Sequence, residues 1–406
     1  MLDADVAVVG AGAAGLSLAH RLSAPGGGRR PRVALIDAPP GPLRPPRRTW
    51  CFWEPGDGTY EAAVTASWQR LAVHDHRGGT TSGSIAPLRY KMIRSDDFEA
   101  LVERELSERS EVRRVEAAVE AVRDVPGGAE VRGTTAGGRP VTVTARWVFD
   151  SRPLKSLPPA RTTLLQHFRG WFVRTERPAF DPRTVRLMDF RTPQPPHGLS
   201  FGYVLPTGPH TALVEYTEFS SAPLSTEAYE AALRHYTGDV LRLGSLSVTG
   251  TETGVIPMTD APFTRQTGPA VFRIGAAGGA TRPATGYTFA AVQRQTRAIA
   301  AAYRAGRRPV PPPPHPVRSR AMDSVLLRAL DTGRVDGADF FARLFRHVPA
   351  ERLLRFLDGR TRLHEDLAIG LRTPVLPMLR TVAELPLLPR RPFRGRDTPP
   401  PPRTFG

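Results

Sequence analysis

The N-terminal segment most constrains what this chain can fold into, because it joins a short apolar run to a regularly spaced glycine motif. The β-branched run Val6–Val9 is typical of a buried parallel strand, and it leads into Gly10-x-Gly12-x-x-Gly15 and a run of small residues. In this motif Gly10 permits a tight turn, Gly12 lets a pyrophosphate approach the backbone, and Gly15 lets the helix pack on the strand. The pyrophosphate then lies at the positive end of the helix dipole. We therefore predict a dinucleotide-binding strand–turn–helix unit.

Two further segments support this prediction. The apolar run Val33–Asp37 ends in an acid 22 positions after Gly15, where an acceptor for ribose hydroxyls belongs. A lone glycine motif often occurs by chance, but here strand, helix and terminal acid stand in register. The run Ala270–Gly275 reads as a strand that returns to the same domain ahead of a helix over 288–303. The predicted cofactor-binding residues are Gly10, Gly12, Gly15, Asp37, Gly275, Gly278, Gly279, Thr285 and Gly286.

Changes in composition divide the chain into four predicted parts. Residues 1–163 form the first part of a Rossmann-like α/β nucleotide-binding domain, and residues 256–308 return to it with a strand and a helix. Residues 164–255 read as an inserted, mostly-β substrate lobe, because strand-like runs alternate with Pro and Gly turns. Residues 309–406 read as a proline-rich linker, a helical tail and a disordered end beyond Leu385. Many two-domain flavoproteins have this interrupted architecture.

Charge and cysteine content narrow the cellular setting. The formal charge is +17, and it reflects either a bias towards Arg, Ala, Pro and Gly or attraction to an anionic membrane surface. We predict no nucleic-acid partner, since no lysine-rich block or nucleic-acid motif is present. The single Cys51 excludes an intramolecular disulfide and favours a reducing compartment. No apolar run reaches the roughly 18 residues of a membrane span, and the nucleotide motif begins almost at Met1. We therefore expect a cytoplasmic, peripherally membrane-associated protein without a targeting peptide, in which the segment 373–389 is either an interfacial attachment or a helical cap.

Five short motifs occur in order along the first three quarters of the chain. They are Arg48-Thr-Trp-Cys-Phe-Trp-Glu54, Phe201-Gly-Tyr-Val-Leu-Pro206, Leu213-Val-Glu-Tyr-Thr217, Gly254-Val-Ile-Pro-Met258 and Thr285-Gly-Tyr287. Together they closely resemble the bacterial flavin-dependent lycopene β-cyclases. The resemblance implies FAD that acts in its reduced form, with NAD(P)H serving only to reduce it. It also implies lycopene or a related acyclic C40 carotenoid as substrate, and cyclisation of its ψ ends to β-ionone rings without net redox change.

The resemblance also points to a catalytic acid. Family members commonly carry two successive acids in the Leu-x-Glu-x-Thr stretch; here Glu215 holds the first place and Tyr216 the second. Ring closure needs a proton on a terminal double bond, and a carboxyl buried among apolar groups has a raised pKa suited to that task. Without the resemblance, Glu215 reads as a solvent-facing residue on an alternating strand. Asp189 and Glu54 are secondary candidates, each of which can instead pair with an arginine.

Aromatic residues near these motifs are predicted to line the polyene site, because aromatic faces stabilise cations. For each of them, packing in the core is the alternative. The predicted substrate-binding residues are Arg48, Trp50, Phe52, Trp53, Phe190, Phe201, Tyr203 and Tyr287. The histidines lack metal-ligand spacing, so no metal site is predicted. Two other functions compete with a cyclase: a flavin monooxygenase or prenyl reductase on the same scaffold, and a non-catalytic carotenoid-binding flavoprotein.

Overall fold

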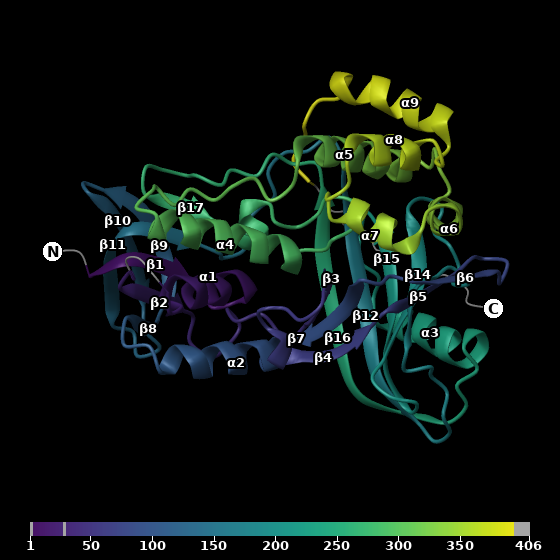
Figure 1. Ribbon diagram of the computed structural model, residues 1–406, viewed down its shortest axis with the longest axis horizontal. Coiled ribbons are helices and arrows are strands. Elements are labelled where there is room, and N and C mark those ends of the chain that lie inside the picture. The colour runs from purple at the N-terminus through teal and green to yellow at the C-terminus, as the bar shows by residue number, and fades with distance from the viewer. Residues whose placement is uncertain (1–2, 27–29, 394–406) are drawn as a thin grey trace.

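The computed structural model describes residues 3–26 and 30–393 and arranges them around two large sheets and one small sheet (Figure 1). The first large sheet carries the N-terminal strand–helix unit. The second large sheet runs across it at the other end of the molecule, and the C-terminal helices cover one side of that second sheet (Figure 1). This mixed α/β architecture with a helical C-terminal region confirms the predicted fold class.

The first sheet has the strand order β8-β2-β1-β11-β10-β9, and β17 pairs with β11. Its central strands are parallel, and β1 is buried almost throughout, as its continuous apolar sequence predicts. Helices α1, α2 and α4 pack on one face of this sheet, where they share a core cluster with β1 and β2. The elements are β1 (Ala4–Val9), α1 (Ala13–Ser23), β2 (Val33–Asp37), α2 (Ser95–Ser107), β8 (Val112–Glu116), β9 (Ala118–Val125), β10 (Gly128–Thr134), β11 (Pro140–Asp150), β17 (Val271–Arg273) and α4 (Phe289–Arg304).

The second sheet has the strand order β16-β12-β15-β14-β13-β5-β6, and α3 packs on one of its faces. Its elements are β5 (Arg70–His74), β6 (Thr80–Ser84), β12 (Thr163–Thr175), β13 (Thr184–Asp189), β14 (Leu199–Pro206), β15 (Thr211–Ser220), α3 (Thr226–His235) and β16 (Leu246–Thr259). The sheet extends beyond the predicted lobe of residues 164–255, because β5 and β6 come from the first part of the chain and β16 runs on to Thr259. The parallel pairing of β13 with β5 joins segments more than 100 residues apart, which sequence periodicity does not report.

A small sheet with the order β3-β7-β4 lies between the two large ones (Figure 1). Its strands are β3 (Thr49–Pro55), β4 (Val64–Trp68) and β7 (Leu88–Arg94). Side chains alternate along β3. Trp50 and Phe52 stack on Phe289 of α4, whereas Trp53 contacts Tyr287. The small sheet therefore presents Cys51 and Trp53 towards the second sheet.

The C-terminal helices pack against the second sheet on the face opposite α3. They are α5 (Val317–Asp331), α6 (Gly337–His347), α7 (Ala350–Leu357), α8 (Leu363–Gly370) and α9 (Val375–Glu384). The prediction of disorder beyond Leu385 is wrong for the residues up to 393, because a helical turn and a bridge between Ala160 and Arg391 fix that stretch. The prediction for 394–406 falls outside the described residues. Within the described ranges, no helix has the length and apolar character needed to cross a membrane.

Candidate active site

The glycine motif has the geometry that its sequence predicts. Gly10 has a φ of +92°, a conformation that L side chains rarely adopt. A Cβ on Gly15 would lie 1.8 Å from the carbonyl oxygen of Gly10, so only glycine allows α1 to approach β1 this closely. A Cβ on Gly12, by contrast, would meet no described heavy atom within 4 Å. The open space beside Gly12 is where a pyrophosphate would lie.

The surroundings of this space also fit an adenosine diphosphate. No acid occupies the first turn of α1, so nothing there cancels the positive end of the helix dipole. Asp37 ends β2, and its carboxylate accepts a hydrogen bond from the Ala11 amide at 3.1 Å. From the return segment, Gly275 has a φ of +64° and lies so close to Ala14 that a Cβ would come within 2.8 Å of that side chain. The return segment thus lies over the start of α1.

The rest of the return segment contacts the second sheet. A Cβ on Gly286 would lie 2.2 Å from Oε1 of Gln166, a β12 residue. That oxygen and Thr285 Oγ1 are buried without hydrogen-bond partners among the described residues. Two buried polar atoms without hydrogen-bond partners, one from the loop and one from β12, thus lie where the loop contacts the second sheet. Gly278 and Gly279 pack closely on Arg273 and Phe263, which holds the loop compact.

The second sheet places Glu215 on the face that looks towards the small sheet. In the register, Tyr203 of β14 and Gly170 of β12 both lie directly opposite Glu215, and Gly170 also lies opposite Glu252 of β16. Directly opposed residues project to the same face of a sheet. Tyr203, Leu205 and Leu213 on this face belong to the core cluster that contains α5, α6 and α7.

Glu215 and Glu252 are both buried and interact with each other by a side-chain hydrogen bond. Burial and the Glu252 carboxyl raise the pKa of Glu215 well above its ordinary range. Thr49 of β3 donates a hydrogen bond from Oγ1 to Glu252 at 2.8 Å. Burial and the neighbouring Glu252 carboxyl therefore favour the protonated form of Glu215.

Three tyrosine hydroxyls meet beside this pair. Tyr90 of β7 is hydrogen-bonded to Tyr203 and, at 2.9 Å, to Tyr287 of the return segment. Cys51 lies against the same group, and burial raises the pKa of its thiol. Burial also raises the pKa of each tyrosine, so the hydroxyls stay protonated. The tyrosines, Cys51 and Trp53 give the carboxyl pair a mostly aromatic wall.

Only part of the predicted substrate-binding set lies near Glu215. Tyr203, Tyr287 and Trp53 belong to the aromatic wall, and Phe190 and Phe201 continue along the same face, with their ring centroids 6.2 Å apart. Trp50 and Phe52 instead point to the opposite side of the small sheet, where they pack on α2 and α4. The Arg48 side chain is exposed, close enough to Glu252 for charge attraction.

The two secondary candidate acids, Asp189 and Glu54, lie away from Glu215. Asp189 lies on the α3 face of the second sheet, where it accepts hydrogen bonds from Arg191 and from the Tyr236 hydroxyl. Burial alone would raise its pKa, but the Arg191 guanidinium outweighs burial and holds the pKa of Asp189 below its usual value. Glu54 binds the fully buried Lys91 at 3.0 Å. Asp189 therefore has the arginine partner that the sequence offered as the alternative, whereas the partner of Glu54 is a lysine.

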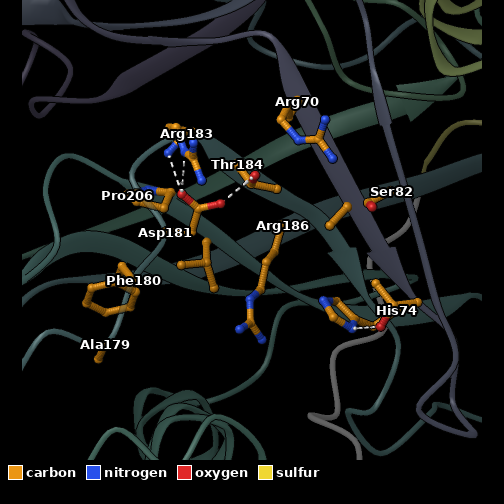
Figure 2. A pocket seen from close by; sticks show the side chains of 13 residues that line it. Arg70, His74, Ser82, Ala179, Phe180, Asp181, Arg183, Thr184, Arg186 and Pro206 are labelled. Atoms are coloured by element: carbon orange, nitrogen blue, oxygen red, sulfur yellow. Dashed lines mark hydrogen bonds and ion pairs between the residues drawn. The ribbon is translucent and has the colours of Figure 1, made fainter.

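One cavity of the described residues lies away from this site. This cavity, of about 520 Å³, lies on the α3 face of the second sheet, over β5, β6 and β13 (Figure 2). Arginines and hydroxyl groups line much of it, and Asp181 at its edge binds Arg183 and Thr184. None of the predicted site residues lines this cavity. We therefore assign the candidate active site to the buried carboxyl pair.

Sequence reasoning missed four residues of this site: Thr49, Tyr90, Gly170 and Glu252. Thr49 lay within a recognised motif, and Glu252 stands two residues before another. Their proximity to Glu215 depends on which strands become neighbours of β12 and on which face the small sheet turns to it. The one sequence signal for this pair was the presence of an acid, Glu215 or Glu252, in each of two strand-like segments.

The fold is that of flavin-dependent oxidoreductases. A geranylgeranyl bacteriochlorophyll reductase-like protein from Thermoplasma acidophilum matches with a TM-score of 0.57 at 13% identity, over 94% of this chain and 99% of that one. The p-nitrophenol 4-monooxygenase from Pseudomonas putida matches with a TM-score of 0.56 at 14% identity, over 95% and 98%. The flavin-dependent monooxygenase PieE, solved in complex with FAD and substrate, matches with a TM-score of 0.57 at 15% identity, over 95% and 72%. No curated protein matches the sequence significantly.

Within this fold class, the sequence identifies a particular family. The model of the lycopene cyclase protein family matches residues 5–383, which is nearly the whole described chain. The chain belongs to the lycopene cyclase family, as the five sequence motifs had indicated.

Proposed function

We propose that this protein is an FAD-dependent lycopene cyclase that converts acyclic ψ ends of a C40 carotenoid to β-ionone rings. Membership of the lycopene cyclase family supports the substrate class. The observation that carries the proposal is the buried Glu215 carboxyl, which lies beside an aromatic wall and whose pKa burial raises.

Glu215 supplies the proton that starts ring closure. Its Oε–H bond breaks as a C–H bond forms at the terminal double bond, and the π electrons of that bond leave a tertiary cation. A neighbouring double bond then attacks the cation and closes the ring. Loss of one ring proton to the Glu215 carboxylate gives the product and restores the acid, so atoms and electrons balance without an oxidant.

The aromatic wall stabilises the cation. The rings of Trp53, Tyr203 and Tyr287 present π faces and belong to, or pack against, one buried core cluster. The Tyr203 and Tyr287 hydroxyls are both hydrogen-bonded to Tyr90, which makes their oxygens poorer nucleophiles towards the cation. Burial also excludes water, which would convert the cation to an alcohol.

The cofactor is FAD, held by the open space beside Gly12, by Asp37 at the end of β2 and by the glycines of the return segment. When bound, reduced FAD supplies negative charge near the developing cation, and NAD(P)H serves only to reduce it. The FAD bound by the similar monooxygenase PieE supports this assignment.

Glu215→Gln tests the acid. The variant keeps the size of the side chain but loses its proton, so cyclisation should fall by roughly 10²–10⁴-fold while FAD content and melting temperature stay unchanged. Glu176→Gln is the control, because Glu176 is exposed just after β12 and should leave the rate unchanged. Equal rates for wild type and Glu215→Gln would remove Glu215 from the mechanism.

Product mass separates cyclisation from the competing functions. Lycopene incubated with the reduced holoenzyme should give a product of unchanged mass and altered chromatographic mobility. Added oxygen would indicate a monooxygenase and added hydrogen a reductase, the activities of the similar structures. Unchanged lycopene would indicate a carrier.

A further inference from the structure

The Glu252 carboxyl takes no part in the reaction steps described above. It is on β16, separated from Glu215 on β15 by the intervening strand β12. Strands lie about 4.8 Å apart, so two side chains on either side of an intervening strand start about 9.6 Å apart and are normally kept apart by its side chain. Here the intervening residue is Gly170, which lies opposite both acids.

The glycine is what allows the two carboxyls to meet. A Cβ at position 170 would lie 2.8 Å from Cγ of Glu215 and 3.4 Å from its Oε1, so alanine would occupy the space that Glu215 fills. The gap over β12 thus joins two acids that a larger residue would separate.

The surroundings of the pair are asymmetric. Glu252 accepts a hydrogen bond from Thr49, and the Arg48 guanidinium attracts its charge. Glu215 instead faces Tyr203 and the protonated thiol of Cys51. A carboxylate is favoured where donors and cations lie, and a neutral acid where they do not.

We propose that Glu252 is a positioning residue that holds one shared proton on Glu215 across the gap left by Gly170. This inference rests on the proposed function, because it assigns Glu252 a part in the same proton transfer. The neighbouring Glu252 carboxyl raises the pKa of Glu215 and orients its O–H bond.

Glu252→Gln removes the charge and keeps the shape. The charge that disfavours ionisation of Glu215 is then lost, so the alkaline limb of the kcat–pH profile should move to lower pH by about one unit or more. KM and FAD content should not change, and Glu252→Asp should restore part of the wild-type profile. The other titratable and charged groups facing the pair are Arg48, Cys51, Tyr90, Tyr203 and Tyr287, all unchanged in this variant.

Gly170→Ala tests the gap itself. It should give the same displaced pH profile as Glu252→Gln, whereas Gly250→Ala on β16 should behave as wild type, since a Cβ there meets its nearest atom at 3.5 Å. An unchanged kcat–pH profile in Glu252→Gln, in an enzyme that cyclises lycopene, would overturn the proposal.

An infrared measurement separates this proposal from the proposed function. Above the ordinary pKa of a glutamate, the holoprotein should still show a protonated carboxyl band, which disappears in Glu215→Gln and weakens in Glu252→Gln. If the bands behave this way but no lycopene is cyclised, the pair stands and the cyclase assignment fails. If Glu252→Gln leaves the band unchanged, the pair is refuted whatever the activity.

A second, independent inference concerns the surface of α8 and α9. Thirteen large apolar side chains are exposed among the described residues, and eight of them lie between positions 363 and 387. Leu363, Leu367 and Leu371 are spaced four residues apart, which places them on one side of α8 and the turn after it. Leu376 and Leu379 of α9 are 71% and 57% exposed. α9 forms the outer edge of the molecule (Figure 1).

Charge indicates what covers this surface, which we call the 363–387 face. Each acid of this face forms an ion pair with arginine: Glu365 binds Arg355, Asp366 binds Arg318, and Glu384 binds two arginines. Arg372 and Arg380, by contrast, are exposed among the leucines. Two copies of such a face would bring like charges together, whereas anionic headgroups complement it.

We infer that the 363–387 face docks on an anionic lipid bilayer, with its leucines below the headgroups and its arginines among them. The +17 charge of the chain adds attraction over a longer range. Apolar insertion is not screened by salt, so part of the binding should survive high ionic strength.

Vesicle co-sedimentation of the full-length protein tests this inference. Wild type should bind vesicles of phosphatidylcholine with phosphatidylglycerol, bind pure phosphatidylcholine less, and remain partly bound at high salt. The triple variant Leu371→Ser, Leu376→Ser, Leu379→Ser should lose about tenfold or more in partitioning, since it removes three of the eight exposed apolar side chains of this face. The control triple Leu43→Ser, Val248→Ser, Val310→Ser changes exposed apolar residues elsewhere and should bind as wild type.

Equal binding by the two triple variants would overturn the lipid assignment. So would a wild-type dimer in gel filtration that the first triple variant converts to a monomer, since that result identifies a second copy as the partner.

Discussion

Replacing Gly12 by valine should abolish FAD binding while leaving the fold intact. At this position a Cβ meets no described heavy atom within 4 Å, and the Gly12 backbone has a φ of −80° that any residue adopts. The protein itself therefore has room for the side chain. The pyrophosphate does not, because the side chain fills the space through which phosphate oxygens reach the first-turn N–H groups of α1.

The magnitude follows from the hydrogen bonds that are lost. Two bonds from backbone N–H groups to a charged phosphate contribute about 1.5–3 kcal/mol each, so the variant should lose about 3–6 kcal/mol of binding free energy. That corresponds to a roughly 10²–10⁴-fold rise in the FAD Kd. Titration of apoprotein followed by flavin fluorescence measures it, and the melting temperature of the apoprotein should stay at the wild-type value.

Gly15→Ala is the matched contrast. Its Cβ would lie 1.8 Å from the Gly10 carbonyl oxygen and 3.2 Å from a methyl group of Val8, so α1 must move away from β1. This variant should lose about 3 kcal/mol or more of apoprotein stability. The reasoning is refuted if Gly12→Val binds FAD as tightly as wild type, or if Gly12→Val and Gly15→Ala destabilise the apoprotein equally.

Three further outcomes are expected. Reduced but not oxidised FAD should support turnover with no stoichiometric NAD(P)H consumption, and steady NAD(P)H oxidation coupled to product would instead indicate a reductase or monooxygenase. Asp189→Asn should lower stability by about 2–3 kcal/mol and leave kcat within a few-fold, because this acid holds Arg191 on the face opposite Glu215. Burial raises the pKa of Asp323, beside Arg282, from 3.8 to about 6, so the folded protein binds this proton more tightly than the unfolded chain. This group's contribution to unfolding free energy should therefore fall between pH 3.8 and 6, and the difference between wild-type and Asp323→Asn denaturation curves should show that slope.

The sequence alone determined the nucleotide-binding unit and the family. Gly10 needs a positive φ and Gly15 packs on the Gly10 carbonyl, so these two constraints arise within one strand–turn–helix unit and the glycine spacing carries the information. Glu215 was also found from sequence, but only through its motif, because strand alternation by itself favoured a solvent-facing residue.

Tertiary structure decided how the remaining residues are used. Asp189 and Glu215 both lie on strands of the second sheet, and only its register shows that they occupy opposite faces. Likewise Trp50 and Trp53 belong to one motif, yet the pleat of β3 places them on opposite faces. Trp50 therefore contacts Phe289 of α4, and Trp53 contacts Tyr287. Sequence periodicity does not say which face of a strand will be covered by which element.

The pairing of Glu215 with Glu252 depended most on the fold. It requires β15 and β16 to flank β12, in a register that places Gly170 between the two acids. Strand order and register are set by the packing of the whole sheet against α3, the small sheet and the C-terminal helices, and those are contacts between distant segments. The sequence therefore contained the residues of the candidate site, but the register of three strands decided that two of its acids form one buried pair.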